Sequence, residues 1–201
     1  MQKLEDLQLE EHTVIVFSSD NGPWTVYGNH AGSTPFREAK GTSFDGGVKS
    51  ALIIKYPGVV PAGQSSDDFL YSVDLMPTLC AITGSPLPEN EIDGENALPV
   101  LENKPGFEYR RPCHAFSTGK NFEGIFSSDG RWKLHLPHKY RQVKTYGNDG
   151  KPGVYAIKEI PLSLFDMEND PMETTDVKED HPEILKELME VAARHEELYY
   201  K

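Results

Sequence analysis

The amino-acid sequence predicts an α/β domain followed by a small antiparallel α+β subdomain. In the first half, the apolar segment 13–17 (TVIVF) is typical of a buried strand and ends in a dense turn signal, SSDNGP. A second apolar segment, 51–56, predicts another strand. In the second half, short strands separated by turns precede one terminal helix, which is typical of a small α+β unit.

Hydrophobic spacing predicts two helices in the first half. Leu4 and Leu7 share one helical face in the polar segment 1–11. Apolar residues recur at helical spacing over 72–84, and Asp74 lies near the start of that segment, where an acidic group suits the helix dipole. A helix followed by an apolar strand and a polar loop favours an α/β sheet, in which ligands bind beyond the carboxyl ends of the strands.

The segment 86–105 is rich in Pro and Glu and predicts a domain boundary. The chain is therefore expected to divide into a part comprising 1–105 and a part comprising 106–201. In the second part we expect short strands at 115–117, 124–127 and 132–136, and then a loop rich in Gly, Lys and Tyr at 139–158. A last strand at 162–165 and an amphipathic helix that begins at His181 complete this part.

The composition excludes several classes of protein. Acidic residues outnumber basic ones by 32 to 20 in the 201 residues, and the net charge of −12 argues against nucleic acid as a partner. No apolar run approaches the roughly 18 residues of a membrane helix, so no membrane partner is expected. Met1 opens a polar, acidic stretch, which is not the pattern of a secretion signal. The two cysteines, Cys80 and Cys113, predict neither a disulfide framework nor a zinc cluster.

Asp20 and Asn21 follow the first predicted strand directly. A carboxylate and an amide carbonyl are oxygen ligands that Ca²⁺ or Mg²⁺ accepts, whereas Zn²⁺ prefers histidine or cysteine. Gly22 allows the backbone to turn sharply after them. The same three residues are also common in an ordinary turn that closes a strand, and both interpretations stay open on these residues alone.

Lys40 precedes a glycine-rich segment, 41–47 (GTSFDGG). Three glycines in seven residues allow the backbone to approach a ligand closely, and a lysine beside them can place a positive charge against an anion. A flexible loop with a solvated lysine is the alternative. Asp45 within the segment is expected to cap the loop rather than to bind a ligand.

Six motifs in the same order resemble the type I sulfatases of the arylsulfatase kind, and the resemblance covers nearly the whole chain. They are TVIVFSSDNG, REAKGTSFDGGV, PGVVPAG with VDLMPTL, SSDGRWKLH, SLFDMENDPMETTDV and HPEIL. The resemblance implies that the first part is the C-terminal part of an alkaline-phosphatase-like mixed-sheet domain. The second part would then be the C-terminal subdomain, an antiparallel sheet with a terminal helix.

The resemblance also implies the roles of several residues. Asp20 and Asn21 would be calcium ligands, and Lys40 would be a catalytic residue that contacts the sulfate. A divalent ion and a lysine would concentrate positive charge where an acidic protein must bind a sulfate ester. His135, in the WKLH strand, resembles a pocket histidine of some arylsulfatases, and His30 is a second candidate for substrate binding; the alternatives are a strand histidine and a loop histidine.

Five basic residues form a local cluster in the sequence, which either favours anionic glycans or is a solvated face: Arg131, Lys133, Lys139, Arg141 and Lys144.

The nucleophile motif of this family, C-x-P-S-R, is absent from the 201 residues. The segment 33–37 (STPFR) resembles its serine version, but Phe36 stands where a serine belongs. We therefore expect the chain to be a C-terminal portion that needs the missing N-terminal half of the catalytic domain and is inactive alone.

Three functions are compatible with the motifs. The first is hydrolysis of a sulfuric ester, with an aryl sulfate or a sulfated glycan as substrate. A phosphohydrolase of the same superfamily is the second, although Asn21 in place of a histidine favours calcium over zinc. A catalytically inactive binding module is the third. Resemblance suggests an exported, periplasmic or lysosomal protein.

Overall fold

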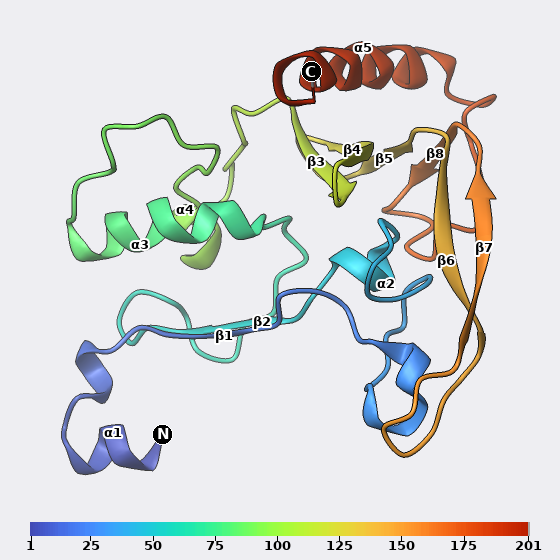
Figure 1. Cartoon of the computed structure of the whole chain (residues 1–201). Helices are drawn as coiled ribbons and strands as arrows, with labels where there is room; N and C mark the ends of the chain where they lie inside the picture. Colours follow the sequence, from blue (N-terminus) through green and yellow to red (C-terminus); the bar gives the residue numbers. More distant parts are fainter. Residues whose placement is uncertain (201) are drawn as a thin grey trace. The chain divides into compact units, whose positions relative to one another are not determined.

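The computed structural model describes residues 1–200, which form two compact units (Figure 1). The first unit combines residues 1–18 with 51–109, and the second combines 19–50 with 110–200. The predicted division at residue 105 takes no account of 19–50, whose contacts lie with the C-terminal half of the chain. No helix within the described residues has both the length and the apolar composition needed to cross a membrane.

The first unit holds one antiparallel strand pair and several short helices. The strands β1 (Ile15–Ser18) and β2 (Leu52–Lys55) pair with Phe17 opposite Ile53. Both side chains are exposed, by 68% and 62%, so the prediction of a buried strand at 13–17 is wrong for this chain. The helical elements are α1 (Gln2–Asp6), η1 (Glu10–His12), η3 (Ser72–Asp74), α3 (Leu75–Thr83) and α4 (Leu98–Leu101).

The helix expected at 72–84 is confirmed as η3 and α3, and Gly84 ends it in the left-handed conformation. The carboxylate of Asp74 is buried and accepts the backbone N–H of Glu95 at 2.8 Å. The hydroxyl of Thr78 accepts the N–H of Ala97 at 2.9 Å. The polar residues of the VDLMPT motif thus hold the connection that follows the helix.

A four-stranded antiparallel sheet is the centre of the second unit, with strand order β3-β4-β5-β8. Its strands are β3 (Cys113–Thr118), β4 (Asn121–Ser127), β5 (Trp132–His135) and β8 (Ser163–Asp166). Helix α5 (Pro182–Tyr199) lies across the sheet, as Figure 1 shows. Ile125, Leu134 and Leu164 of the sheet are fully buried in one core cluster with Leu188 and Val191 of the helix. The predicted meander with a terminal helix is confirmed.

The loop predicted at 139–158 is wrong, because this segment forms a long antiparallel hairpin. Strand β6 (His138–Thr145) pairs with β7 (Val154–Ile160). Tyr140 is buried and packs edge-on against Phe44, with ring centroids 4.8 Å apart. Its neighbours in sequence are exposed, so β6 alternates between the core and solvent.

The glycine-rich segment belongs to this core rather than to a flexible loop. Phe44 is fully buried and forms a second core cluster with Tyr140, Ile160 and Phe165. It precedes the single-turn helix α2 (Asp45–Val48), and the helical turn η2 (Thr25–His30) lies earlier in the same unit. The segment that carries Lys40 is therefore fixed by packing.

Candidate functional site

Backbone hydrogen bonds join the two loops that the sequence singled out. The N–H of Gly22 donates to the carbonyl of Gly47 at 2.9 Å, and the N–H of Lys40 donates to the carbonyl of Pro23 at 3.1 Å. A methyl group at Gly22 would lie 1.8 Å from the carbonyl oxygen of Gly46, so only glycine allows this approach. The close fit of the two glycine-containing loops brings the residues before Gly22 to the lysine.

Lys40 and Asp20 form the candidate site. The ammonium of Lys40 lies 3.9 Å from a carboxylate oxygen of Asp20 and 5.3 Å from the centre of the Trp24 ring. The side chain of Asp20 is 79% exposed and that of Lys40 is 36% exposed. Asn21 follows Asp20 and is partly buried. A cation and a carboxylate thus lie close together at an accessible position, and Asn21 is adjacent to the carboxylate in sequence.

His30 lies apart from this pair. Its Nε2 is 3.7 Å from a carboxylate oxygen of Asp149 in the turn of the β6–β7 hairpin, and both side chains are largely exposed. Asn29 donates to the same carboxylate at 3.2 Å. The contacts of His30 within residues 1–200 include none to Asp20, Asn21 or Lys40, so its role in substrate binding stays a prediction.

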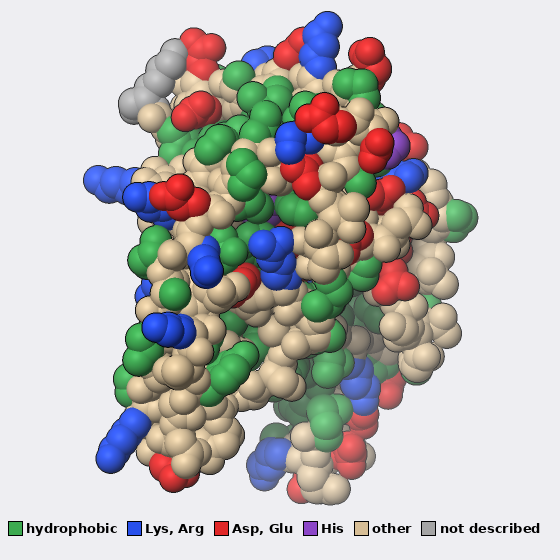
Figure 2. All heavy atoms as spheres, turned by 90° about the vertical axis from the view of Figure 1, so that its right-hand side faces the viewer, with side chains coloured by type: hydrophobic (Ala, Val, Ile, Leu, Met, Phe, Trp, Pro, Cys, Tyr) green, Lys and Arg blue, Asp and Glu red, His purple; other side chains and the backbone are tan. Residues whose placement is uncertain are grey.

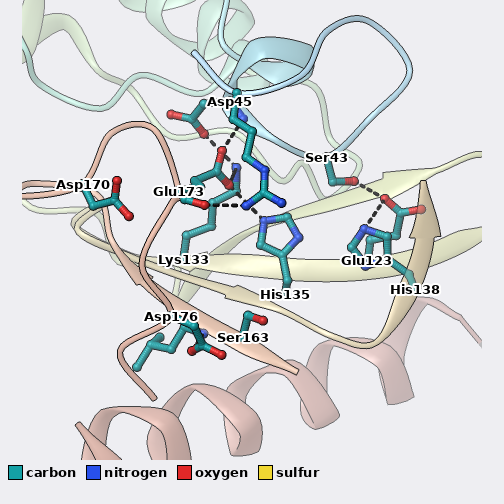
Figure 3. Close-up of polar contacts among 12 residues, drawn as sticks. Ser43, Asp45, Glu123, Lys133, His135, His138, Ser163, Asp170, Glu173 and Asp176 are labelled. Carbon is teal, nitrogen blue, oxygen red and sulfur yellow. Dashed lines mark hydrogen bonds and ion pairs between the residues drawn. The ribbon is translucent and has the colours of Figure 1, made fainter. Parts of the chain in front are cut away.

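A buried charged network lies behind the glycine-rich segment (Figure 3). The ammonium of Lys133 on β5 is 2.8 Å from a carboxylate oxygen of Asp45 and 2.7 Å from one of Glu173. The second oxygen of Glu173 accepts the backbone N–H of Asp45 at 2.8 Å. Arg37 donates to the backbone carbonyl of Glu173. The network therefore fixes both ends of the segment 37–45 that carries Lys40.

His135 belongs to this network and has no exposed surface. Its Nε2 is 3.0 Å from the Glu173 carboxylate, and its ring stacks on Phe44 at 4.9 Å. Burial, and then the nearby charge of Lys133, hold the pKa of His135 well below its ordinary value, so the ring is neutral. Substrate contact by His135 stays a prediction; its burial favours a positioning role.

The motif DMENDPMETTD presents Glu173 to the network. Glu173 has a positive φ of 52°, which is costly for this residue type. The carboxylate of Asp170 accepts the backbone N–H groups of Thr174 and Thr175 at 2.6 and 2.7 Å and so holds the turn. Burial alone would raise the pKa of Asp166, but hydrogen bonds from Asn169 and Arg131 outweigh it and lower the pKa.

Sequence reasoning missed the network because its members lie far apart in the chain. The sequence groups Lys133 with a basic cluster for which a solvated face is one interpretation. The complete burial of Lys133 overturns that interpretation for this residue. The sequence assigns no role to Glu173, and the carboxylate of Asp45, expected to cap the loop, forms a buried ion pair with Lys133 instead. The available signal was the charged residue inside the apolar strand WKLH, because a charge on a buried strand needs a partner.

Two hollows adjoin the second unit's loops. The larger, about 600 Å³, is lined by residues of the η2 region, the approach to Lys40 and β6, among them Thr25, Ser33, Glu38, Gln142 and Tyr146. The smaller, about 220 Å³, is lined by Gly41, Glu123 and Arg141 with neighbours from β6 and β7. Hydroxyl, amide and charged groups are prominent in the lining of the larger hollow, which suits a polar ligand, whereas the surface of the smaller one is mainly apolar.

The oxygen donors at the site match a hard cation in kind but are too few to hold it. Ca²⁺ takes six to eight oxygen ligands, whereas Asp20 and Asn21 supply one side chain each. Among the described residues, no group of three histidine, cysteine, aspartate or glutamate side chains is placed to hold a metal ion. The pair can therefore provide only part of a calcium site.

Known proteins resemble the chain over nearly its whole length. The sulfatase family model matches residues 1–85. Arylsulfatase A of Bos taurus is 30% identical over 204 residues, which cover 98% of this chain and 39% of that protein. Human steryl-sulfatase is 30% identical over 216 residues, which cover 96% and 36%. The crystal structure of the sulfatase PsFucS1 from Pseudoalteromonas sp. superposes with a TM-score of 0.76 at 22% identity, covering 98% of this chain and 40% of that one.

These matches define a protein of the alkaline-phosphatase-like fold class, as predicted. The chain belongs to the sulfatase family. It spans about two fifths of the length of the curated relatives it matches.

Proposed function

We propose that the chain carries part of the active site of a sulfuric ester hydrolase. The observation that supports this proposal is the approach of the Lys40 ammonium to the Asp20 carboxylate at 3.9 Å, because it unites the two loops that the family resemblance assigns to the sulfate and to calcium. Lys40 would bind the sulfate oxygens, and Asp20 and Asn21 would be two of the calcium ligands.

Charge explains why such a site needs both groups. A protein with a net charge of −12 repels a sulfate ester, so positive charge must be concentrated locally. Calcium, when bound, would polarise the sulfuryl oxygens. Lys40 adds a cation in a fixed position. Its backbone N–H donates to the carbonyl of Pro23, and the residues after it are held by the ion pair between Asp45 and Lys133. Preorganised charge of this kind stabilises a transition state without rearrangement.

The nucleophile and the other calcium ligands of the proposed active site would come from sequence outside the 201 residues. No C-x-P-S-R segment occurs among the 201 residues, and two ligands cannot complete a calcium site. We infer that the chain corresponds to a C-terminal portion of a sulfatase and that the missing N-terminal half supplies the nucleophile and further ligands. An exported or lysosomal location is part of the same proposal.

Sulfate binding by the chain itself provides the first test. Inorganic sulfate is titrated into the ¹⁵N-labelled chain, and the amide signals of Gly22 and Gly41 are followed. We expect them to shift, and we expect Lys40→Gln to weaken the apparent affinity about tenfold, as loss of a charge-assisted contact does. Lys49→Gln is the matched control, because Lys49 lies in the same unit with no carboxylate within 4 Å among residues 1–200. Equal effects of the two substitutions would remove Lys40 from the site.

Turnover provides the second test. A longer protein that includes an upstream C-x-P-S-R segment is expected to hydrolyse 4-nitrophenyl sulfate, and Lys40→Ala should lower its kcat/KM by about 10² to 10³. The 201-residue chain alone should not hydrolyse this ester. Turnover by the chain alone, or absence of that segment from the coding sequence upstream, would contradict the proposal; the second result would favour a binding module.

Metal content separates the sulfatase from a phosphohydrolase of the same superfamily. Asn21 stands where a zinc site would use a histidine, so the longer protein should retain calcium rather than zinc. Elemental analysis after dialysis against both ions decides between them, and zinc retention with hydrolysis of 4-nitrophenyl phosphate would favour the phosphohydrolase.

A further inference from the structure

A second cation lies beside the lysine loop and has no role in the site described above. Arg141 is an exposed residue of β6, and its guanidinium lies 5.0 Å from the centre of the Tyr155 ring. A methyl group at Gly41 would lie 2.2 Å from a terminal nitrogen of Arg141. The glycine that follows Lys40 thus leaves the space that the guanidinium occupies.

Two aromatic rings connect the cations. The indole N–H of Trp24 donates to the hydroxyl of Tyr155 at 3.0 Å. Lys40 lies over the Trp24 ring and Arg141 over the Tyr155 ring. Each cation is therefore held on the face of a ring, and the hydrogen bond joins the two rings.

The hairpin register explains the position of Arg141. Arg141 pairs with Ile157, and Val143 pairs with Tyr155, so Arg141 and Tyr155 are diagonal neighbours on one face of the hairpin. An aromatic ring at this diagonal reaches a long side chain. The guanidinium is thus oriented by the strand pairing as well as by the ring.

Arg141 differs from three other members of the basic cluster, each of which is paired with a carboxylate. Lys133 is buried in its network, Arg131 pairs with Asp166 and Glu168, and Lys139 pairs with Glu159. Within residues 1–200, no carboxylate lies within 4 Å of the Arg141 guanidinium. Figure 2, which views the side where β6 and β7 lie in Figure 1, shows basic and acidic side chains mixed over the surface rather than a general basic face.

We propose that Arg141 is a specificity-determining residue that binds a second anionic group of the substrate, next to the sulfate bound by Lys40. This inference rests on the proposed function and narrows its substrate class to sulfate esters that carry a second anionic group close to the sulfate. Within residues 1–200, Asp20 is the one carboxylate within 4 Å of the Lys40 ammonium, and a calcium ion bound by Asp20 would compete with Lys40 for that carboxylate. Two cations would then face the ligand together, and a planar guanidinium suits a sulfate or carboxylate.

The test compares two sugars that differ by one sulfate. Isothermal titration calorimetry measures binding of N-acetylgalactosamine 6-sulfate and N-acetylgalactosamine 4,6-disulfate to the full chain in low-salt buffer containing calcium. We expect the disulfated sugar to bind about tenfold more tightly. Arg141→Gln should reduce this preference to less than about twofold and leave the affinity for the monosulfated sugar unchanged.

The control is Lys144→Gln, because Lys144 is an exposed cation of the same strand that also lacks a carboxylate within 4 Å among the described residues. It should keep the full preference, and the urea midpoints of both variants should match that of the parent chain. Lys40→Gln should weaken binding of both sugars. If Lys40→Gln weakens both but Arg141→Gln leaves the ratio unchanged, the subsite is wrong and the proposed function stands. If Lys40→Gln changes neither, the proposed function fails; no preference in the parent chain, including no binding, overturns the subsite.

Discussion

The ammonium of Lys133 lies 2.7 Å from a carboxylate oxygen of Glu173, and neither side chain has any exposed surface. A second carboxylate, that of Asp45, shares the same ammonium at 2.8 Å. The Lys133 ammonium therefore faces two carboxylates in the interior, and the neutral His135 and the Arg37 guanidinium adjoin Glu173 in the same network. This arrangement connects the sheet, the DMENDPMETTD turn and the loop of the candidate site.

We expect Lys133→Met to lower the free energy of unfolding by about 3–5 kcal/mol, because it leaves two buried carboxylates without their cation. Urea denaturation of the full chain, followed by circular dichroism, measures the change. Lys139→Met is the control: Lys139 is exposed and its ion pair with Glu159 is exposed as well, so it should change little. Similar midpoints for the two variants would show that the network does not support the fold.

The pKa of His135 predicts a pH dependence of stability. Burial keeps the folded-state pKa well below the unfolded value, so on acidification the unfolded chain takes up a proton before the folded chain does. Stability is then lost as the pH falls through the unfolded pKa of about 6.5. Relative to His135→Gln, the parent chain should lose about 1.4 kcal/mol between about pH 7.5 and about pH 5.5.

Urea midpoints across this pH range test the prediction. The exposed His12 provides a matched substitution, His12→Gln, which should leave the pH profile unchanged. Parallel profiles for the parent chain and His135→Gln would mean that His135 titrates alike in the folded and unfolded states.

The contact between Gly22 and Gly46 predicts a steric effect at the site. Gly22→Ala should destabilise the chain by about 2 kcal/mol or more, because the new methyl would meet a backbone carbonyl that cannot move aside. It should also abolish the sulfate-induced shifts of the loop amides. Gly119→Ala is the comparison, since its φ of +63° gives strain of about 1 kcal/mol but the methyl would meet nothing within 4 Å. If Gly119→Ala removes the shifts equally, loop contact is not their cause.

The exposed pair Phe17 and Ile53 predicts self-association of the chain. Two large apolar side chains face each other across an antiparallel pair, and exposed apolar strands favour pairing between molecules. Replacing both with threonine, which suits strands, should raise the concentration at which light scattering begins severalfold. Val48→Thr is the control: Val48 is 40% exposed but lies outside the strands, so this substitution should not change the concentration at which scattering begins. Unchanged scattering of the double variant would refute this.

Local patterns predicted the elements that depend on local chemistry. The meander, the helix that ends at Gly84 and the terminal helix followed from turn residues and hydrophobic spacing. The β6–β7 hairpin was missed because its exposed face carries Lys, Arg and Tyr, which resembled a loop. An irregular loop of some 20 residues inside a compact unit is uncommon, and that length was itself a warning.

The candidate site was predictable only where its residues stand in short local motifs. Asp20 and Lys40 stand in short motifs, and the structure brings them within 4 Å. Glu173 reaches Asp45 across 128 positions of sequence, so no local pattern could reveal it. His135 was noticed as a residue but not as an interior one, because burial depends on Phe44 and the sheet together.

The position of Glu173 has a consequence for proteolysis. Asp20, Asn21 and Lys40 all lie within the first 40 positions, yet the carboxylate that holds their loop comes from a turn near the other end of the chain. A protease that cut the chain just ahead of Glu173 would leave Asp20, Asn21 and Lys40 chemically intact but would break their covalent connection to the carboxylate that holds their loop.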